Sequence, residues 1–146
     1  MQATAFLPDV LPPDPFMLFA DWFTEATTPR IQPNPDAMVL ATVDADGRPS
    51  ARVVLCKHLV PSPGYVVFFT NYQSRKGQAL SAVPRAAAVF HWDGLSRQVR
   101  IEGTVVRSPA AESDAYCSSR PVPSRLGAWA SQQGEPLASR AALAHQ

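Results

Sequence analysis

Two groups of cations in this sequence could bind an anion. Arg52 and Lys57 flank an apolar run, and Arg75 and Lys76 directly follow Ser74. Serine is a favoured helix N-cap, so the two cations after it would fall in the first turn of a helix. The helix dipole disfavours cations there, but a bound phosphate would be favoured by the helix N-terminus and by both side chains. The pattern predicts a phosphate site, and a solvated basic turn is the alternative.

The direction of Arg52 and Lys57 depends on whether their strand is continuous. Side chains alternate between the two faces of a strand, so an unbroken strand would point these two cations in opposite directions. A bulge, or twist near the strand end, would let both reach one ligand. Without such a break, each is an ordinary charge near a strand end.

A second group of polar residues lies in the last third of the chain. Tyr116 and Arg120 are four residues apart, so they share a face if a helix continues that far. Ser124 follows a proline-rich elbow, and the three could hold a second phosphate or simply lie on the surface. Gln98 and Gln133 carry amides that could donate to a carbonyl or a ring nitrogen.

Several other chemistries lack their signals. The sequence has no glycine-rich dinucleotide or P-loop pattern, no HExxH, no CxxC and no nucleophile elbow. His58, His91 and His145 do not have the spacing of metal ligands, so no metal site is predicted. Cys56 and Cys117 suit free thiols in a reducing compartment, and a single disulfide between them is the alternative.

Composition limits the class of protein. The chain has 146 residues, which is one domain by length, and 46% of them are hydrophobic, enough to bury a core. The net charge of +1 has no long run of either sign, which argues against nucleic-acid and membrane-surface binding. No signal-peptide pattern and no apolar run of membrane-spanning length are present, so we expect a cytoplasmic protein.

The pattern of apolar residues and turns predicts a mainly β protein. Residues 1–13 form an irregular arm before a domain over 14–146, whose first helix begins at Asp14-Pro15 and buries Phe16, Phe19 and Phe23. Asp46-Gly47 and Asp93-Gly94 are turn signals. We expect strands at 37–43, 50–59, 65–71, 86–92 and 98–107, and helices at 74–83, 109–118 and 124–131. Antiparallel strands interrupted by short helices favour a small barrel.

Taken together, seven segments resemble the pyridoxine/pyridoxamine 5′-phosphate oxidase family. The resemblance runs from about Asp14 to the C-terminus and keeps the order and spacing of the family. Singly each motif is weak, whereas jointly they are specific. The segments are AMVLATVD (37–44), RVVLCK (52–57), FFTN (68–71), SRK (74–76), RQV (97–99), YCSSRP (116–121) and LGAWASQQ (126–133).

The resemblance implies an FMN-binding split β-barrel that acts as a homodimer, with FMN at the subunit interface. It implies substrate contacts from Lys57, Tyr116, Arg120 and Ser124, of which the last three hold the substrate phosphate. It also implies a set of FMN contacts: Arg52, Val53, Val54, Leu55, Cys56, Lys57, Phe69, Thr70, Arg75, Lys76, Gln98 and Gln133.

The implied reaction belongs to vitamin B6 metabolism. A hydride equivalent passes from C4′ of pyridoxamine or pyridoxine 5′-phosphate to flavin N5, and pyridoxal 5′-phosphate is released, with water taking part for the amine. Dioxygen then reoxidises the flavin and gives hydrogen peroxide. The flavin does the redox chemistry and the protein supplies orientation and charge.

The sequence also departs from the family pattern. The family normally continues with a segment carrying a Trp, two Arg and a His, and it has a basic stretch that is not recognisable in residues 1–13. Val122 stands where many members have a second Arg, and Gly134 where a flavin-contacting Ser is common. Two alternatives follow: a related flavin oxidase of the phenazine type, or a non-catalytic module that binds FMN or pyridoxal phosphate. Lys57, Tyr116 and Arg120 favour the phosphorylated pyridine.

Overall fold

The computed structural model describes residues 7–108. Its helices are α1 (Pro15–Thr27), α2 (Arg75–Ala82) and the short 3-10 helix η1 (Asp93–Leu95). Its strands are β1 (Ala37–Val43), β2 (Pro49–Leu55), β3 (His58–Val60), β4 (Tyr65–Val67), β5 (Arg85–Trp92) and β6 (Arg97–Thr104). The helices expected at 109–118 and 124–131 lie outside the described residues. Neither α1 nor α2 is long and apolar enough to cross a membrane.

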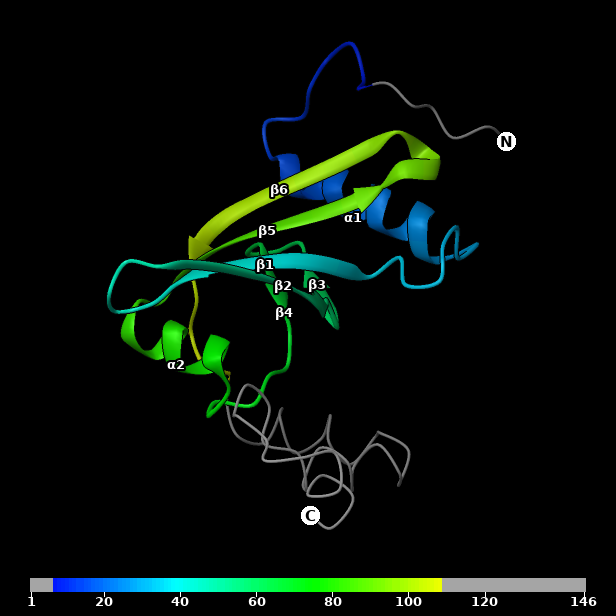
Figure 1. The fold of residues 1–146 in the computed structure, drawn as a ribbon. Coiled ribbons are helices and arrows are strands. Elements are labelled where there is room, and N and C mark those ends of the chain that lie inside the picture. The colour runs from blue at the N-terminus through cyan, green and yellow to red at the C-terminus, as the bar shows by residue number, and fades with distance from the viewer. Residues whose placement is uncertain (1–6, 109–146) are drawn as a thin grey trace.

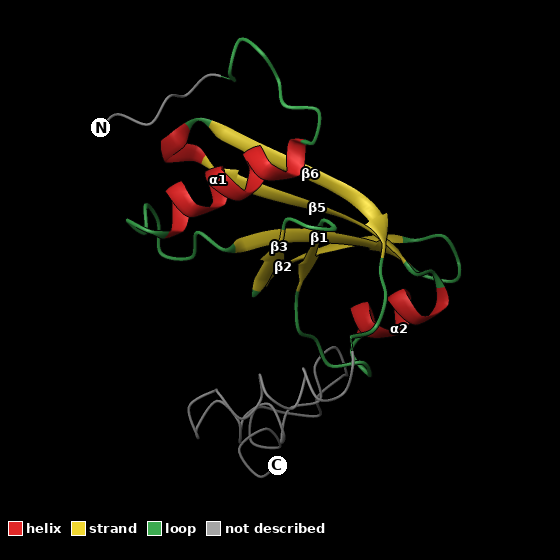
Figure 2. Cartoon of the chain, turned by 180° about the vertical axis from the view of Figure 1, so that it is seen from behind, coloured by secondary structure: helices red, strands yellow, loops and turns green. Residues whose placement is uncertain are grey.

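The strands form two antiparallel sheets. One has the order β2-β1-β5-β6, and the other is the β3–β4 hairpin. Figures 1 and 2 show α1 lying across β5 and β6 at one end of the large sheet, with α2 at the opposite end near the β1–β2 turn. This is the mainly antiparallel β architecture with short helices that the sequence predicts.

Helix α1 begins and packs as its sequence predicts. The Asp14 carboxylate accepts a hydrogen bond from the N–H of Phe16 at 2.9 Å, and a proline occupies the first helical position. The ring centroid of Phe19 lies 5.2 Å from that of Phe90, and the Phe23 ring meets Trp92 edge-on at 6.3 Å. Aromatic packing of this kind fixes the helix against the end of β5.

One face of the large sheet is the core. Met38, Leu40 and Thr42 are buried on β1, and the register places Leu40 beside Arg52 on β2 and beside Ala88 on β5. These residues share one face, here called the inner face, because side chains alternate along each strand. Val53 lies on the opposite, outer face and is 66% exposed.

The strand expected over 50–59 is in fact two strands. β2 ends at Leu55, after which the N–H of Cys56 donates to Asp36 O at 2.8 Å and the N–H of Lys57 donates to Val67 O at 2.8 Å. The chain therefore leaves the large sheet at Cys56 and joins the β3–β4 hairpin at Lys57. The pattern of apolar residues cannot show this change of partner, because both strands are apolar.

Two other strands are shorter than expected. β4 ends at Val67 because its partner β3 begins at the paired His58, so the ladder has no further residues. β6 ends at Thr104, opposite Arg85, the first residue of β5. The residue before β5 is Pro84, which has no N–H to extend the ladder, and its carbonyl accepts from Val105. The Asp93-Gly94 turn is formed by η1.

Candidate functional site

The N-terminus of α2 is built by Ser74. Its buried hydroxyl donates to Asn71 O at 2.6 Å and accepts from the N–H of Gly77 at 3.3 Å. This N-cap places Arg75 and Lys76 in the first helical turn, as the sequence predicts. The loop before α2 packs tightly against the helix, because a Cβ added at Gly77 would lie 2.6 Å from the carbonyl oxygen of Asn71 in that loop.

Arg52 lies close to these two cations. Burial, followed by the positive charge of Arg75, lowers the pKa of Arg52. Burial, followed by the charge of Arg52, lowers the pKa of Lys76. Cations from β2 and from α2 therefore converge, and we call Arg52, Arg75 and Lys76 the cation cluster.

The cation cluster has the chemistry of an anion site. Arg52 and Lys76 are partly desolvated by burial, and the three positive charges repel one another, which raises the free energy of the cluster in the absence of an anion. A phosphate would neutralise the charges and would also accept hydrogen bonds from the first turn of α2. A dianion on a flexible chain, such as a nucleotide phosphate, therefore fits these residues.

The guanidinium of Arg52 is held by groups that sequence reasoning missed. Nη1 donates to Thr42 Oγ1 at 2.7 Å, and Nη2 donates to Ser50 Oγ at 2.9 Å. The signal in the sequence was Thr42 itself, a polar residue at a position of β1 where Met38 and Leu40 predict an apolar one.

The segment after Arg52 has mixed environments. The side chains of Val53 and Leu55 lie on the outer face, Val54 packs against the core, and Cys56 is buried. Burial raises the pKa of the Cys56 thiol to about 11, so this thiol is neutral at pH 7. Within residues 7–108, β2 is an edge strand of its sheet, and one side of its backbone is open to a ligand.

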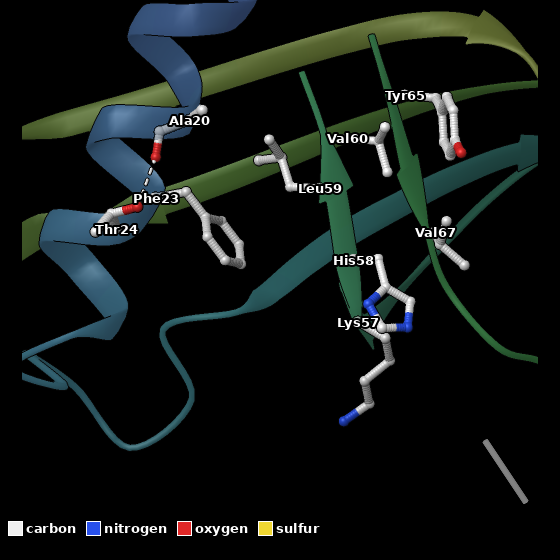
Figure 3. A pocket seen from close by; sticks show the side chains of 9 residues that line it. All are labelled: Ala20, Phe23, Thr24, Lys57, His58, Leu59, Val60, Tyr65 and Val67. Carbon is white, nitrogen blue, oxygen red and sulfur yellow. Dashed lines mark hydrogen bonds between the residues drawn. The ribbon is translucent and has the colours of Figure 1, made fainter. Parts of the chain in front are cut away.

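Lys57 lies at the end of a cleft of about 520 Å³ between α1 and the β3–β4 hairpin. Figure 3 shows Lys57 and His58 at one end of β3, with Tyr65 at the other end of the hairpin. Phe23 and Thr24 of α1 line the opposite wall, where the Thr24 hydroxyl donates to the carbonyl of Ala20. The lining of the cleft mixes polar side chains, those of Thr24, Lys57, His58 and Tyr65, with apolar ones.

Phe69 and Thr70 line a second cavity, of about 650 Å³, on the inner face. The hydroxyl of Thr70 lies 3.5 Å from that of Ser74, the N-cap of α2. This contact joins the loop after β4 to the N-cap of the helix that carries Arg75 and Lys76. Arg52, Thr70, Arg75 and Lys76, all expected at the cofactor, thus gather around the N-terminus of α2.

Gln98 is not brought to this site. It pairs with His91 across β5 and β6 and lies on the outer face, whereas Arg52 lies on the inner face. The strand order puts β2 and β6 at opposite edges of the sheet, three strand spacings or about 14 Å apart. Tyr116, Arg120, Ser124 and Gln133 lie outside the described residues.

Comparison with known proteins gives the family. Residues 23–146 match the family model described as pyridoxamine 5′-phosphate oxidase. Proteins named pyridoxine/pyridoxamine 5′-phosphate oxidase are similar to this chain: 57% identity over 131 residues in Paraburkholderia phymatum, and 58% over 123 residues in Bordetella pertussis. The alignments cover 90% and 84% of this chain, but 60% and 57% of those relatives, so the chain spans little more than half of their length.

Solved structures agree with this assignment. PhzG from Burkholderia lata 383, solved in complex with tetrahydrophenazine-1-carboxylic acid, is 31% identical with a TM-score of 0.88, over 99% of this chain and 71% of that chain. A pyridoxamine 5′-phosphate oxidase-related, FMN-binding protein from Nostoc punctiforme is 18% identical with a TM-score of 0.67, over 92% and 71%, and it supports the fold alone. The architecture is that of the FMN-binding split barrels. The chain belongs to the pyridoxamine 5′-phosphate oxidase family.

Proposed function

We propose that this chain binds FMN and oxidises pyridoxamine or pyridoxine 5′-phosphate to pyridoxal 5′-phosphate, with reduction of dioxygen to hydrogen peroxide. The observation that carries the proposal is the convergence of Arg52 and Lys76, from separate elements, at the N-terminus of α2. The family match supports the reaction class. We place the reaction in the cytoplasm, where the free thiol of Cys56 suits a reducing environment.

Different groups among the described residues bind different parts of FMN. The cation cluster holds the FMN phosphate, and the open backbone edge of β2 accepts the polar edge of the ring system. Phe69 and Thr70 form the wall of the FMN site that borders the cavity of about 650 Å³ on the inner face. Bound FMN supplies the two-electron acceptor that the protein's own side chains lack. Lys57 contacts the substrate together with Tyr116, Arg120 and Ser124.

A homodimer explains the position of Gln98. One protomer cannot bring its own Arg52 and Gln98 to the same ring system, because they lie on opposite faces at opposite edges of the sheet. A second copy, packed outer face to outer face, could place its Gln98 beside β2 of the first. The outer face carries Val39, Val53 and Leu55, exposed apolar residues that such packing would bury.

A second candidate is oxidation of a different aromatic substrate. The likeness to PhzG, which was solved with a tetrahydrophenazine carboxylic acid, favours it. The two candidates share the cofactor and differ at the substrate. A phosphorylated pyridine requires a second phosphate site, whereas a phenazine precursor does not.

The test begins with the purified chain and added FMN. We expect a yellow complex, seen as a flavin absorbance band and as quenching of FMN fluorescence. Pyridoxamine 5′-phosphate under air should then yield the aldehyde and hydrogen peroxide, while unphosphorylated pyridoxamine, the matched control, should react far more slowly.

Three other outcomes would change the conclusion. A chain that binds FMN but oxidises only a tetrahydrophenazine carboxylic acid supports the second candidate. A chain that binds FMN and oxidises neither is a binding module. Failure to bind FMN at all contradicts every one of these functions.

A further inference from the structure

The guanidinium of Arg52 is oriented entirely by neutral groups in the described part of the chain. Its two terminal nitrogens donate to the hydroxyls of Thr42 and Ser50, at 2.7 and 2.9 Å. Two backbone carbonyls, those of Leu40 at 3.3 Å and Ser50 at 3.4 Å, complete the set of acceptors. A carboxylate would orient the guanidinium equally well, but it would also neutralise it.

Packing alone does not explain a threonine at position 42. The side chain is 2% exposed and follows Met38 and Leu40 on the inner face of β1, where valine would have nearly the same shape. A buried hydroxyl is unfavourable unless it is hydrogen-bonded, and the partner of this one is Arg52. Thr42 is too deeply buried to be a surface contact, so its effect on a ligand would pass through Arg52.

We propose that Thr42 and Ser50 are positioning residues that fix the guanidinium of Arg52 for the phosphate of bound FMN and leave its positive charge intact. The proposal rests on the function proposed above. It adds that the phosphate site depends on the neutral hydroxyls of Thr42 and Ser50, which accept hydrogen bonds from Arg52. Two hydroxyls hold the planar guanidinium in one orientation, so less conformational entropy is lost when the phosphate binds.

The first experiment compares Thr42→Val with Thr42→Ser. Valine removes the hydroxyl and keeps the branched shape, whereas serine keeps the hydroxyl. Thr42→Val should weaken FMN binding about tenfold, the effect of one hydrogen bond to a charged group, and Thr42→Ser should stay within about twofold of wild type. Ser50→Ala, at a half-buried position, should behave like Thr42→Val and serves if the valine variant does not fold.

Riboflavin separates positioning from a general structural role. It has the ring system of FMN without the phosphate, so the affinity ratio of FMN to riboflavin should fall about tenfold in Thr42→Val and Ser50→Ala. The rise in Tm caused by inorganic phosphate gives the same comparison without the ring, and it should shrink in both variants. An equal loss of affinity for FMN and riboflavin, or unchanged FMN binding, would overturn the proposal.

Ser50→Asp tests the requirement for neutrality. The new carboxylate would pair with Arg52 and compete with the phosphate, so FMN binding should weaken by more than about thirtyfold while the Tm of the apoprotein is kept or raised. FMN binding as tight as in wild type would contradict the role given to neutral acceptors. If wild type itself binds neither FMN nor riboflavin, the proposed function fails first, and that result is distinct from a failure confined to the variants.

Discussion

At the level of single residues, the cation cluster raises the free energy of the folded apoprotein. The pKa of Lys76 is lowered by burial first and by Arg52 second. A base with a lowered pKa binds fewer protons when folded than when unfolded, so its unfavourable contribution is relieved as pH rises toward 10.5. A bound phosphate relieves the same repulsion without a loss of protons.

Replacing Lys76 tests this view directly. Lys76→Ala should weaken FMN binding by about 1–3 kcal/mol, the range of a charge-assisted hydrogen bond. The affinity can be measured from the quenching of flavin fluorescence. Arg30→Gln is the control, because it removes one positive charge from a residue that donates to Pro33 O beyond the end of α1. Equal affinities in wild type and Lys76→Ala would mean that the basic turn is merely solvated.

The buried thiol of Cys56 predicts a loss of stability at high pH. Its pKa is raised from 9.0 to about 11 by burial, so the folded state keeps a proton that the unfolded state loses. The stabilisation is complete below pH 9 and is lost as pH rises through about 11, at a cost of about 2–3 kcal/mol. Denaturant unfolding of wild type and Cys56→Ala from pH 7 to 11 should give a difference that shrinks with pH, and a constant difference would refute the assignment.

At the level of elements, the change of sheet at Cys56 and Lys57 separates two environments. Arg52 stays in the large sheet and belongs to the cation cluster, while Lys57 lies at the cleft beside α1. The strand break also removes the strict alternation that would force these two side chains to opposite faces.

The two helix N-caps give a matched pair of variants. Ser74→Ala should lower the free energy of unfolding by about 1–2 kcal/mol and should also weaken FMN binding severalfold, because Ser74 positions Arg75 and Lys76. Asp14→Ala removes the exposed cap of α1 and should cost about 0.5–1 kcal/mol with FMN affinity unchanged. If both variants lose FMN affinity in proportion to their stability, the cap of α2 has no special role at the site.

At the level of the whole molecule, the homodimer proposed above would pack a second copy against the outer face of the large sheet. Val53→Asp would place a charge among the exposed apolar residues of that face and should give a monomer that binds FMN weakly, measured by light scattering and flavin titration. Met17→Asp is the control, because it adds the same charge at an exposed apolar residue of α1. A wild-type chain that is monomeric with FMN bound would contradict the homodimer.

Mixing two variants tests whether Gln98 acts across the interface. If Arg52 and Gln98 at one site come from different protomers, a mixed dimer of Arg52→Ala and Gln98→Ala has one intact site and one doubly altered site. Co-expression should therefore restore FMN binding that neither variant shows alone. No restoration would mean that both residues act within one protomer, or that Gln98 does not contact the flavin.

The sequence by itself determined the local structure. The bounds of β1, the caps of α1 and α2 and the alternation along β6 were predicted, because each depends on residues within a few positions of one another. The placement of Arg75 and Lys76 in a first helical turn followed from Ser74 in the same way.

Only the tertiary structure decided which distant residues meet. It divides the segment 50–59 between two sheets and brings the hydroxyl of Thr42 within hydrogen-bonding distance of Arg52. It also places Gln98 on the outer face. Each of these depends on pairing between distant backbone groups, which no local pattern specifies. The register between β1 and β2, set by a whole ladder of hydrogen bonds, placed the hydroxyl of Thr42 next to a guanidinium ten residues away along the chain.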